Sequence, residues 1–417
     1  MSTGSRLMDK VNERLKKAKL KFNKEEFEVQ YSTGFLALDF LNGSMVKVND
    51  GNGFTTQYRS VGIVDGSSNM FIGRSGCGKS TLVFQCIGNI ARDYPRCEVY
   101  IDDIEGSLPM SRKEFLLGLS KEELDPNSPN CRVNFRNTGI NTENVYQQIL
   151  FIHDSKVENR AEYEYDTGLY DLYGNRIIKL IPTLYFIDSF AMLLPEDVLD
   201  KDELDAGMGP TKVAKVNTNL IKKISQLLRD ANIILFSINH INDDPQTGFL
   251  PKAAQISGLK QGERLPGGKA ALYISNNIFR LDDRTALKES EGYGIAGQIV
   301  DITLVKSRTN QNKRSVPLIF NKTMGGFDPI LSMFHLLKSE GRVSGAGARL
   351  YFESCPDIKF SMREFKEMVS MNADLQRAFA IESRNILDKL LSNNENKSAN
   401  NSSFNLFKAI NDLDTNL

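Results

Sequence analysis

The chain contains 417 residues, of which 41% are hydrophobic, and its 52 acidic and 52 basic residues give a formal net charge of zero. This length and apolar content predict one large α/β domain with smaller additions. The five cysteines are scattered and form no CxxC pair, which excludes a disulfide framework and a zinc site and predicts a reducing, intracellular setting. The balanced charge does not exclude a nucleic-acid partner, because a local basic groove matters more than the total.

The N-terminal segment is basic and carries a helical apolar pattern. Residues 5–22 place apolar side chains on one face and lysines on the other, with the apolar positions at Met8, Val11, Leu15 and Ala18. The segment has no long apolar run, which excludes a signal peptide or membrane span and predicts a cytoplasmic protein. A helix this short must pack on another surface. The spacing alone favours neither of two docking surfaces, its own domain or a neighbouring subunit.

A glycine-rich stretch between an apolar strand and an amphipathic helix carries the strongest functional signal. It reads Gly73-Arg74-Ser75-Gly76-Cys77-Gly78-Lys79-Ser80-Thr81, with the spacing of a phosphate-binding loop, or P-loop. Its glycines let successive N–H groups surround a β-phosphate at the positive end of the next helix. Lys79 would neutralise the β- and γ-phosphates, and Ser80 would complete a Mg²⁺ shell. The predicted nucleotide-binding residues here are Gly73, Ser75, Gly76, Gly78, Lys79, Ser80 and Thr81.

Two later strands end in carboxylates. Residues 97–106 form an apolar strand followed by acidic residues that include Glu105, and residues 184–189 form another that ends at Asp188. Because ligands in open α/β sheets lie beyond the carboxyl ends of strands, both ends are expected to face the nucleotide. Asp188 is expected to hold Mg²⁺ together with Ser80. Glu105 would orient the attacking water, although a solvated loop glutamate is the simpler interpretation from spacing alone.

Regular elements alternate with polar loops through the middle of the chain. Helices are expected at 80–92, 141–156 and 211–230, and strands at 232–238, 271–281 and 297–306. Turn-rich segments at 43–60 and 157–180 indicate a loop or hairpin and an inserted surface hairpin without assigned chemistry. The alternation of strands and helices predicts an α/β fold.

After the strand at 232–238 the regular pattern stops for nearly thirty residues. Beyond two aspartates, this stretch carries more basic than acidic residues and several glycines; its basic residues include Lys252, Lys260, Arg264 and Lys269. Long loops inside compact domains are either functional or disordered. This composition suits a DNA phosphate backbone, whereas a merely solvated surface loop is the simpler interpretation of composition alone.

The C-terminal part predicts a small addition to the domain. Residues 341–391 mix short apolar segments with helical spacing and predict a subdomain. Residues 392–403 are rich in Asn and Ser and are expected to be disordered. Beyond them lies a short apolar stripe next to two aspartates, made of Phe404, Phe407, Ile410 and Leu413. The sequence leaves open whether this stripe docks on a partner or on its own domain.

The order of these motifs resembles the RecA family of strand-exchange recombinases, especially its phage UvsX-type members. Beside the P-loop, the resemblance is carried by Ser-Thr-Gly-Phe-Leu-Ala-Leu-Asp at 32–39, Tyr-Ile-Asp-Asp-Ile-Glu at 100–105, Phe-Ile-Asp-Ser at 186–189, Ser-Ile-Asn-His at 237–240 and Leu-Val-Lys-Ser-Arg-Thr at 304–309. It implies a RecA-like P-loop ATPase core at 31–340 with a twisted, mostly parallel sheet. An N-terminal oligomerisation helix and linker (1–30), a small C-terminal subdomain (341–391) and a linker with an apolar tail (392–417) complete the implied organisation.

The resemblance also implies roles for individual residues. Glu105 becomes the residue that activates the attacking water, and Asp188 and Ser189 belong to the second nucleotide motif. His240 becomes the sensor of the γ-phosphate, at a position where bacterial relatives have glutamine. Lys79, Glu105 and His240 then form the catalytic machinery of one subunit.

The resemblance places the subunit interface and the DNA loops as well. Lys306 and Arg308 would act in trans, as arginine-finger-like cations on the ATP of a neighbouring subunit. The two DNA-binding loops fall at about 195–211 and 242–268. The first is crowded with acidic residues, which repel a phosphate backbone, so only its end is suited to DNA. The predicted DNA-binding residues are Met208, Lys212, Lys252, Lys260, Arg264 and Lys269.

Together these matches predict a DNA-dependent ATPase that acts as a recombinase. It would bind ATP and Mg²⁺, form helical homo-oligomeric filaments on single-stranded DNA, and promote pairing and strand exchange with homologous duplex DNA in recombination, repair and recombination-dependent replication. A single-strand-binding protein and a mediator protein are further implied partners, and a phage origin would place the protein in the host cytoplasm. Two alternatives stay open: a RecA-fold ring helicase or motor ATPase, and an ATP-gated DNA-coating scaffold filament without strand exchange.

Overall fold

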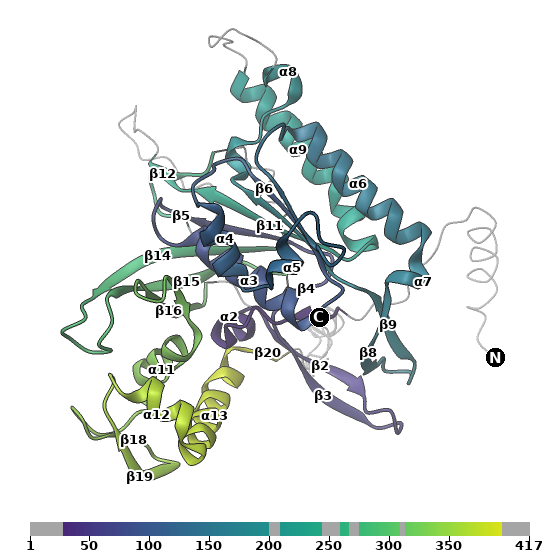
Figure 1. Cartoon of the computed structure of the whole chain (residues 1–417). Coiled ribbons are helices and arrows are strands. Elements are labelled where there is room, and N and C mark those ends of the chain that lie inside the picture. Colours follow the sequence, from purple (N-terminus) through teal and green to yellow (C-terminus); the bar gives the residue numbers. More distant parts are fainter. Residues whose placement is uncertain (1–27, 200–208, 244–258, 267–274, 309–312, 394–417) are drawn as a thin grey trace, which may run out of the picture.

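A nine-stranded mixed sheet lies at the centre of the molecule (Figure 1). The structure, a computed structural model, describes residues 28–199, 209–243, 259–266, 275–308 and 313–393. The strand order is β17-β16-β15-β14-β5-β11-β10-β6-β7. The strands span β5 Ser68–Gly73, β6 Glu98–Asp103, β7 Val133–Arg136, β10 Thr183–Asp188, β11 Ile233–His240, β14 Asn277–Leu287, β15 Gly297–Lys306, β16 Ser315–Asn321 and β17 Gly326–Asp328. The α/β fold predicted from the sequence is confirmed.

Parallel and antiparallel pairing divide this sheet into two parts. From β14 through β5, β11, β10 and β6 to β7, neighbouring strands are parallel. From β14 through β15 and β16 to β17 they are antiparallel. The sheet is mixed, and most of its strand pairs are parallel, as predicted. Strands β5 and β10 are buried along their whole length, as expected for parallel strands covered on both faces. The carboxyl ends of all the parallel strands therefore lie along one edge.

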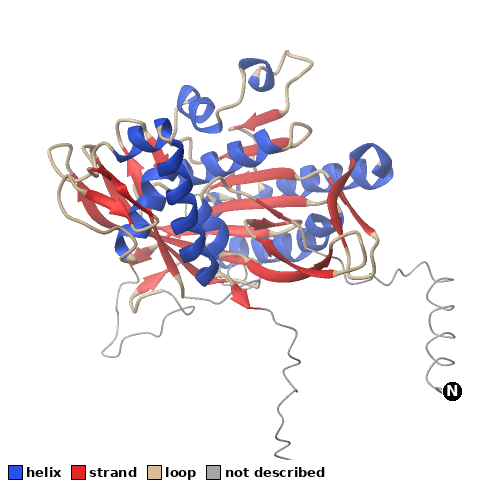
Figure 2. Ribbon diagram, turned by 90° about the horizontal axis from the view of Figure 1, so that it is seen from below, coloured by secondary structure: helices blue, strands red, loops and turns tan. Residues whose placement is uncertain are grey.

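Helices cover both faces of the sheet (Figure 2). Successive side chains of a strand point to opposite faces, and β10 shows this alternation: Leu184 and Phe186 belong to one hydrophobic cluster, Tyr185 and Ile187 to the other. The first cluster contains residues of α3 (Lys79–Asp93) and α4 (Met110–Leu117), and the second contains residues of α6 (Thr142–Glu158) and α9 (Gly209–Asp230). The sheet is thus the middle of three layers.

A second sheet is assembled from three distant parts of the chain. Its order is β20-β2-β8-β9, with β3 paired to β2. The strands span β2 Ser44–Asn49, β3 Thr55–Ser60, β8 Glu164–Tyr170, β9 Arg176–Leu180 and β20 Ser392–Asn393. Both β2–β3 and β8–β9 are antiparallel hairpins. The second confirms the hairpin predicted at 157–180, and the first shows that the segment 43–60, predicted as a loop or hairpin, is a hairpin.

The C-terminal region packs onto the main domain through aromatic side chains. It contains β18 Leu350–Phe352, β19 Cys355–Phe360, α12 Phe365–Met371, α13 Ala373–Leu387 and the 3₁₀-helix η2 Asp388–Leu390. The ring of Phe365 stacks on Phe334 of α11 (Pro329–Ser339), with 4.0 Å between centroids. Because the residues of this region belong to the same hydrophobic cluster as α3, the region continues the main core.

Several boundaries differ from the predictions. The strand expected at 271–281 is β14, which begins at Asn277 and continues to Leu287 because its second half pairs with β15. The first two residues of the segment expected to be disordered form β20, because they pair with β2. The predicted N-terminal helix at 5–22 and the apolar stripe beyond residue 403 lie outside the described residues.

The remaining elements are short. They are β1 Gln30–Tyr31, α2 Leu36–Leu41, β4 Ile63–Val64, α5 Lys121–Leu124, α7 Arg160–Tyr163, the 3₁₀-helix η1 Phe190–Met192, α8 Glu196–Leu199, β12 Asn242–Asp243 and β13 Glu263–Arg264. Helix α8 begins the predicted first DNA loop, and β12 pairs with β13 at the base of the second. In the described part of the chain, no helix has the length and apolar character needed to cross a membrane.

Candidate functional site

The P-loop turns the buried strand β5 into helix α3 at the carboxyl edge of the sheet. Gly76 and Gly78 have φ angles of +83° and +89°, a region that residues with a Cβ rarely adopt. A Cβ at Gly78 would also lie 3.0 Å from the ring of Phe327. Glycine is therefore required at Gly78 by conformation and by space, and α3 begins directly after it at Lys79.

Lys79 is folded into the loop rather than into solvent. It is only 5% exposed, and its Nζ donates to the backbone carbonyl oxygens of Gly73 at 3.1 Å and Arg74 at 2.8 Å. These neutral acceptors bind an ammonium group less strongly than an anionic phosphate oxygen does. The loop thus holds the positively charged Lys79 ammonium group at its centre, where it can exchange these carbonyl oxygens for phosphate oxygens.

Ser80 and Asp188 meet across the sheet edge, where the Ser80 hydroxyl donates to Asp188 Oδ2 at 2.7 Å. Burial raises the pKa of Asp188 to about 6, and the nearby carboxylates of Glu105 and Asp103 add to the rise, while the Ser80 hydrogen bond opposes it. The other carboxylate oxygen, Oδ1, is buried and has no hydrogen-bond partner among the described residues. A buried oxygen without a partner is costly, and oxygen ligands of this kind suit Mg²⁺. Ser80 and Asp188 therefore fit the predicted metal site.

The other predicted nucleotide-binding residues surround this pair. Thr81 is 8% exposed in the first turn of α3, and Ser75 is exposed in the loop. Ser189 follows Asp188 and is fully buried, with a hydroxyl that has no partner among the described residues. The predicted residues thus lie around one end of β5 and β10.

Of three carboxylates at the end of β6, two are neutralised by basic side chains. The Arg136 guanidinium donates to both oxygens of Asp102 at 2.7 Å each. Asp103 forms a buried ion pair with Lys113. The Glu105 side chain is 30% exposed and forms no ion pair with Lys or Arg among the described residues. Glu105 is therefore the carboxylate of this group best placed to act on a ligand.

Glu105 contacts His240, the other residue assigned a role next to the γ-phosphate. Its Oε2 lies 3.2 Å from His240 Nε2. The backbone N–H groups of Ile104 and Glu105 both donate to the carbonyl oxygen of Asp188, at 2.7 and 3.0 Å. Since β6 and β11 flank β10, the Glu105–His240 contact crosses the end of β10. The sequence predicted the two residues separately and carried no signal for their pairing.

The strand that carries His240 is joined to the base of the second predicted DNA loop. The Asn239 side chain donates to the carbonyl oxygen of Pro266 at 2.9 Å. Directly after His240, β12 pairs with β13. His240 is therefore connected through its neighbours to both ends of this loop.

Two ion pairs, which sequence analysis missed, hold the same loop base. Arg280 of β14 donates to Glu263 of β13 at 2.6 and 3.0 Å, and both side chains are buried. Arg74 of the P-loop donates to Asp243 of β12 at 2.7 and 3.2 Å, in an exposed position. The P-loop and the loop base are thus in direct contact, although only the three-dimensional fold brings them together.

Lys306 and Arg308 lie away from the P-loop of their own chain. Strand β14 places Leu281 beside Gly73, but the antiparallel β15 ends with Lys306 beside Ile278, nearer the start of β14. Burial and the nearby Arg308 charge lower the pKa of Lys306 to about 8. The structure does not bring these two cations together with the phosphate site within one chain.

The predicted DNA-binding residues are described only in part. Lys260 and Arg264 are exposed at the base of the second loop. Lys212 belongs to α9, but its side chain is not among the described ones. Met208, Lys252 and Lys269 lie outside the described residues.

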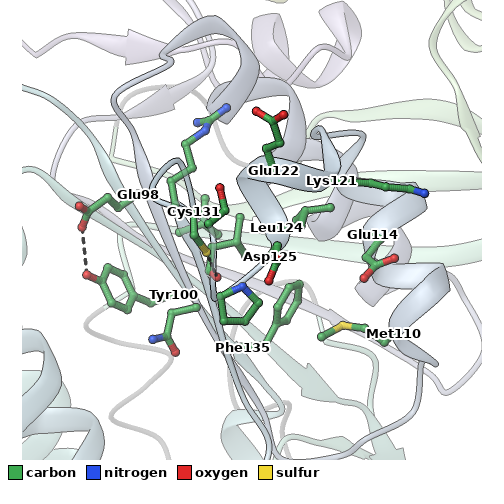
Figure 3. A pocket seen from close by; sticks show the side chains of 16 residues that line it. Glu98, Tyr100, Met110, Glu114, Lys121, Glu122, Leu124, Asp125, Cys131 and Phe135 are labelled. Carbon is green, nitrogen blue, oxygen red and sulfur yellow. Dashed lines mark hydrogen bonds between the residues drawn. The ribbon is translucent and has the colours of Figure 1, made fainter.

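A hollow of about 860 Å³ lies elsewhere, beside the edge strand β7 (Figure 3). Its apolar lining includes Met110, Leu124 and Phe135. Its charged lining is made of four acidic residues, Glu98, Glu114, Glu122 and Asp125, and two basic ones, Lys121 and Arg132. No residue predicted to bind nucleotide lines it. The lining is net acidic, which disfavours phosphates, and it contains no P-loop residue, so this hollow is not the predicted nucleotide site.

The functional proposal for this chain rests on the geometry of the site, because no protein-family model matches the chain and a search of curated proteins found no match.

Proposed function

We propose that this chain is an ATP-dependent DNA recombinase with a RecA-like core. The observation that carries the proposal is the convergence of Lys79, the Ser80–Asp188 pair and the Glu105–His240 pair. They lie at the carboxyl ends of four adjacent strands, β5, β11, β10 and β6. This is where ligands bind in parallel α/β sheets.

In this proposal each side chain of the site has one task in ATP hydrolysis. Lys79 exchanges its loop carbonyls for oxygens of the β- and γ-phosphates. Glu105 orients a water molecule for attack on the γ-phosphate and accepts its proton. Ser80 and Asp188 would hold Mg²⁺, which supplies positive charge to the phosphates when it is bound.

The Glu105–His240 contact links hydrolysis to DNA binding. A γ-phosphate competes with Glu105 for the imidazole of His240, and movement of His240 reaches the second loop through Asn239 and β12. The loop, with Lys260 and Arg264 at its base, would then bind the phosphate backbone of single-stranded DNA. Sequence is read by base pairing with the homologous duplex, so the protein needs only backbone contacts.

The position of Lys306 and Arg308 supports a filament. Because they lie away from the P-loop of their own chain, they act on ATP only if a neighbouring subunit presents its site to them. The net acidic hollow beside β7 supports the same assembly. Residues 5–22 are basic and carry an apolar stripe, so those of a neighbouring subunit complement the lining of the hollow in charge and in apolar character. Such an interface is head-to-tail and generates a helix when the rotation does not close.

Negative-stain electron microscopy with single-stranded DNA and a non-hydrolysable ATP analogue tests this assembly. We expect helical filaments from the unaltered chain and none from Lys79→Ala. Closed rings would favour the motor ATPase. Filaments that fail to exchange strands between homologous DNA molecules would favour the coating scaffold.

A further inference from the structure

An apolar groove lies between three helices at the junction of the main domain and the C-terminal region. It has a volume of about 500 Å³ and is bounded by α2, α11 and α13. Its apolar lining includes Leu36, Phe40, Ile330, Met333, Phe379 and Leu387. Leu36 is 50% exposed although it sits beside an otherwise buried core. An apolar concavity of this kind is a place where a further apolar segment docks.

The rim of the groove is positively charged. Arg59 and Arg384 both line it, and both approach the same carboxylate, Asp388. Arg59 binds Asp388 in a bidentate pair at 2.6 and 2.7 Å, whereas Arg384 lies 4.0 Å from it. The Arg384 side chain is 69% exposed. Two cations therefore share one anion, and Arg384 is positioned to bind another.

The segment 404–414 of the same chain has the complementary chemistry. Its apolar residues recur at helical spacing, at Leu406, Phe407, Ile410 and Leu413. Asp412 and Asp414 flank the last of them. At about 100° per residue, a helix places these apolar side chains on one face. Asp414 lies beside this face at its C-terminal end, whereas Asp412 lies on the opposite face. The apolar face matches the lining of the groove, and Asp414 matches the Arg384 rim.

The path of the chain places this segment close to the groove. Helix α13 forms one wall of the groove and leads through η2 to Leu391, which is buried beside Gly43, just after α2. The described chain then ends in β20, paired with Ser44 and Met45 of β2. The intervening residues 394–403 span roughly 30 Å when extended, which is ample for a return to α2 and α13.

We propose that residues 404–414 dock into the groove between α2, α11 and α13 of their own chain as an amphipathic helix, with Asp414 at the Arg384 rim. The short tether favours this segment over a second copy, because it sets an effective concentration on the order of millimolar. The groove lies apart from the nucleotide site, so the docking does not depend on the proposed ATPase function.

Amide hydrogen exchange of the full chain, followed by mass spectrometry, tests the docking. We expect amides of residues 404–414 to exchange about tenfold or more slowly than unstructured peptide amides. Ile410→Asp in the tail and Leu36→Asp in the groove should each abolish this protection. Met371→Asp is the matched control, because Met371 is 77% exposed and does not line the groove; it should leave the protection unchanged.

A charge exchange keeps the test decisive if Leu36→Asp disturbs folding. Arg384→Glu should reduce the protection, and Arg384→Glu combined with Asp414→Lys should restore it. Exchange of the tail at the unstructured rate in the unaltered chain would overturn the proposal. Protection that is insensitive to the groove variants, or that increases with protein concentration as expected for a second copy, would overturn it as well.

Discussion

The two ends of the parallel strands are built in different ways. At the carboxyl ends, the site is made of short motifs, each attached to a strand that is buried along its length. Near the amino ends, the second sheet joins the hairpins at 44–60 and 164–180 and β20, whose strands are mostly exposed or half-buried. The first arrangement follows from local sequence and parallel topology, and the second from pairing between distant segments. The residues of the proposed site therefore lie at one end of the parallel strands, and the second sheet lies at the other.

The second sheet is fastened to the core by a cluster of tyrosines. Tyr31 lies 3.0 Å, oxygen to oxygen, from Tyr165 of β8, and the side chain of Asn232 donates to Tyr31 at 2.7 Å. The ring of Tyr94 packs edge-on against both tyrosines, with centroids 5.0 and 5.7 Å apart. Asn232 directly precedes β11, so this cluster lies at the amino end of the parallel strands. Changes here should alter stability rather than chemistry.

The largest expected effect comes from Lys79→Ala, which removes the only cation folded into the P-loop among the described residues. We expect ATP turnover to fall by on the order of 10³-fold or more, measured as phosphate release. Lys47→Ala, an exposed position in the second sheet, is the matched control and should keep the unaltered rate. Unchanged turnover in Lys79→Ala would remove the P-loop from the catalytic account.

Arg308→Ala and Glu105→Gln should each lower turnover, by on the order of 10³-fold for a finger cation and 10²-fold for the water-orienting carboxylate. Because the two residues would serve one site from different subunits, an equal mixture of the two variants should regain activity at roughly a quarter of its interfaces. Phosphate release from titrated mixtures measures this. A mixture no more active than its components would place Arg308 in cis or outside the reaction.

A smaller effect concerns Asp39, which accepts hydrogen bonds from the Ser32 hydroxyl at 2.6 Å and the Thr33 N–H at 2.8 Å. Burial raises its pKa from 3.8 to about 6, although these hydrogen bonds oppose the rise. The folded state therefore holds the proton more tightly than the unfolded state. The stability due to this group is present below pH 4 and is lost as the pH rises through 6, by on the order of 3 kcal/mol.

Urea unfolding at pH 4 and pH 7 measures this effect. Asp39→Asn cannot ionise, so it should show a smaller loss of unfolding free energy over that interval. Burial also raises the pKa of Asp188, Glu28 and Asp283, so part of the loss should persist in this variant. Equal losses in the unaltered chain and in Asp39→Asn would contradict the assignment.

The smallest effect is expected at the tyrosine cluster. Tyr165→Phe removes the hydrogen bond to Tyr31, while Asn232 still binds Tyr31, so the loss should be about 1 kcal/mol of unfolding free energy with ATP turnover unchanged. Tyr173→Phe, at a position 86% exposed, should change neither. A loss of ATP turnover in Tyr165→Phe would contradict this prediction and show that the tyrosine cluster affects the site at the opposite end of the parallel strands.

The sequence predicted the parts whose signals are local. The P-loop glycines, the strand ending at Asp188 and both hairpins have short-range signatures, and the structure contains these elements. The pairing of β2 with β8 and β20, the Glu105–His240 contact and the Arg74–Asp243 pair join residues more than a hundred positions apart. Periodicity carries no information about such contacts. The sequence likewise does not predict that Arg136 neutralises Asp102, although this ion pair helps to distinguish Glu105 as the carboxylate available to a ligand.

The central claim is that one site couples ATP hydrolysis to single-stranded DNA. Its most direct test is the steady-state ATPase rate with and without single-stranded DNA, repeated at raised salt. The proposal predicts strong stimulation by single strands that fades as salt increases, because backbone contacts release counterions. Equal rates with and without DNA would contradict the coupling and leave a P-loop ATPase whose partner is not DNA.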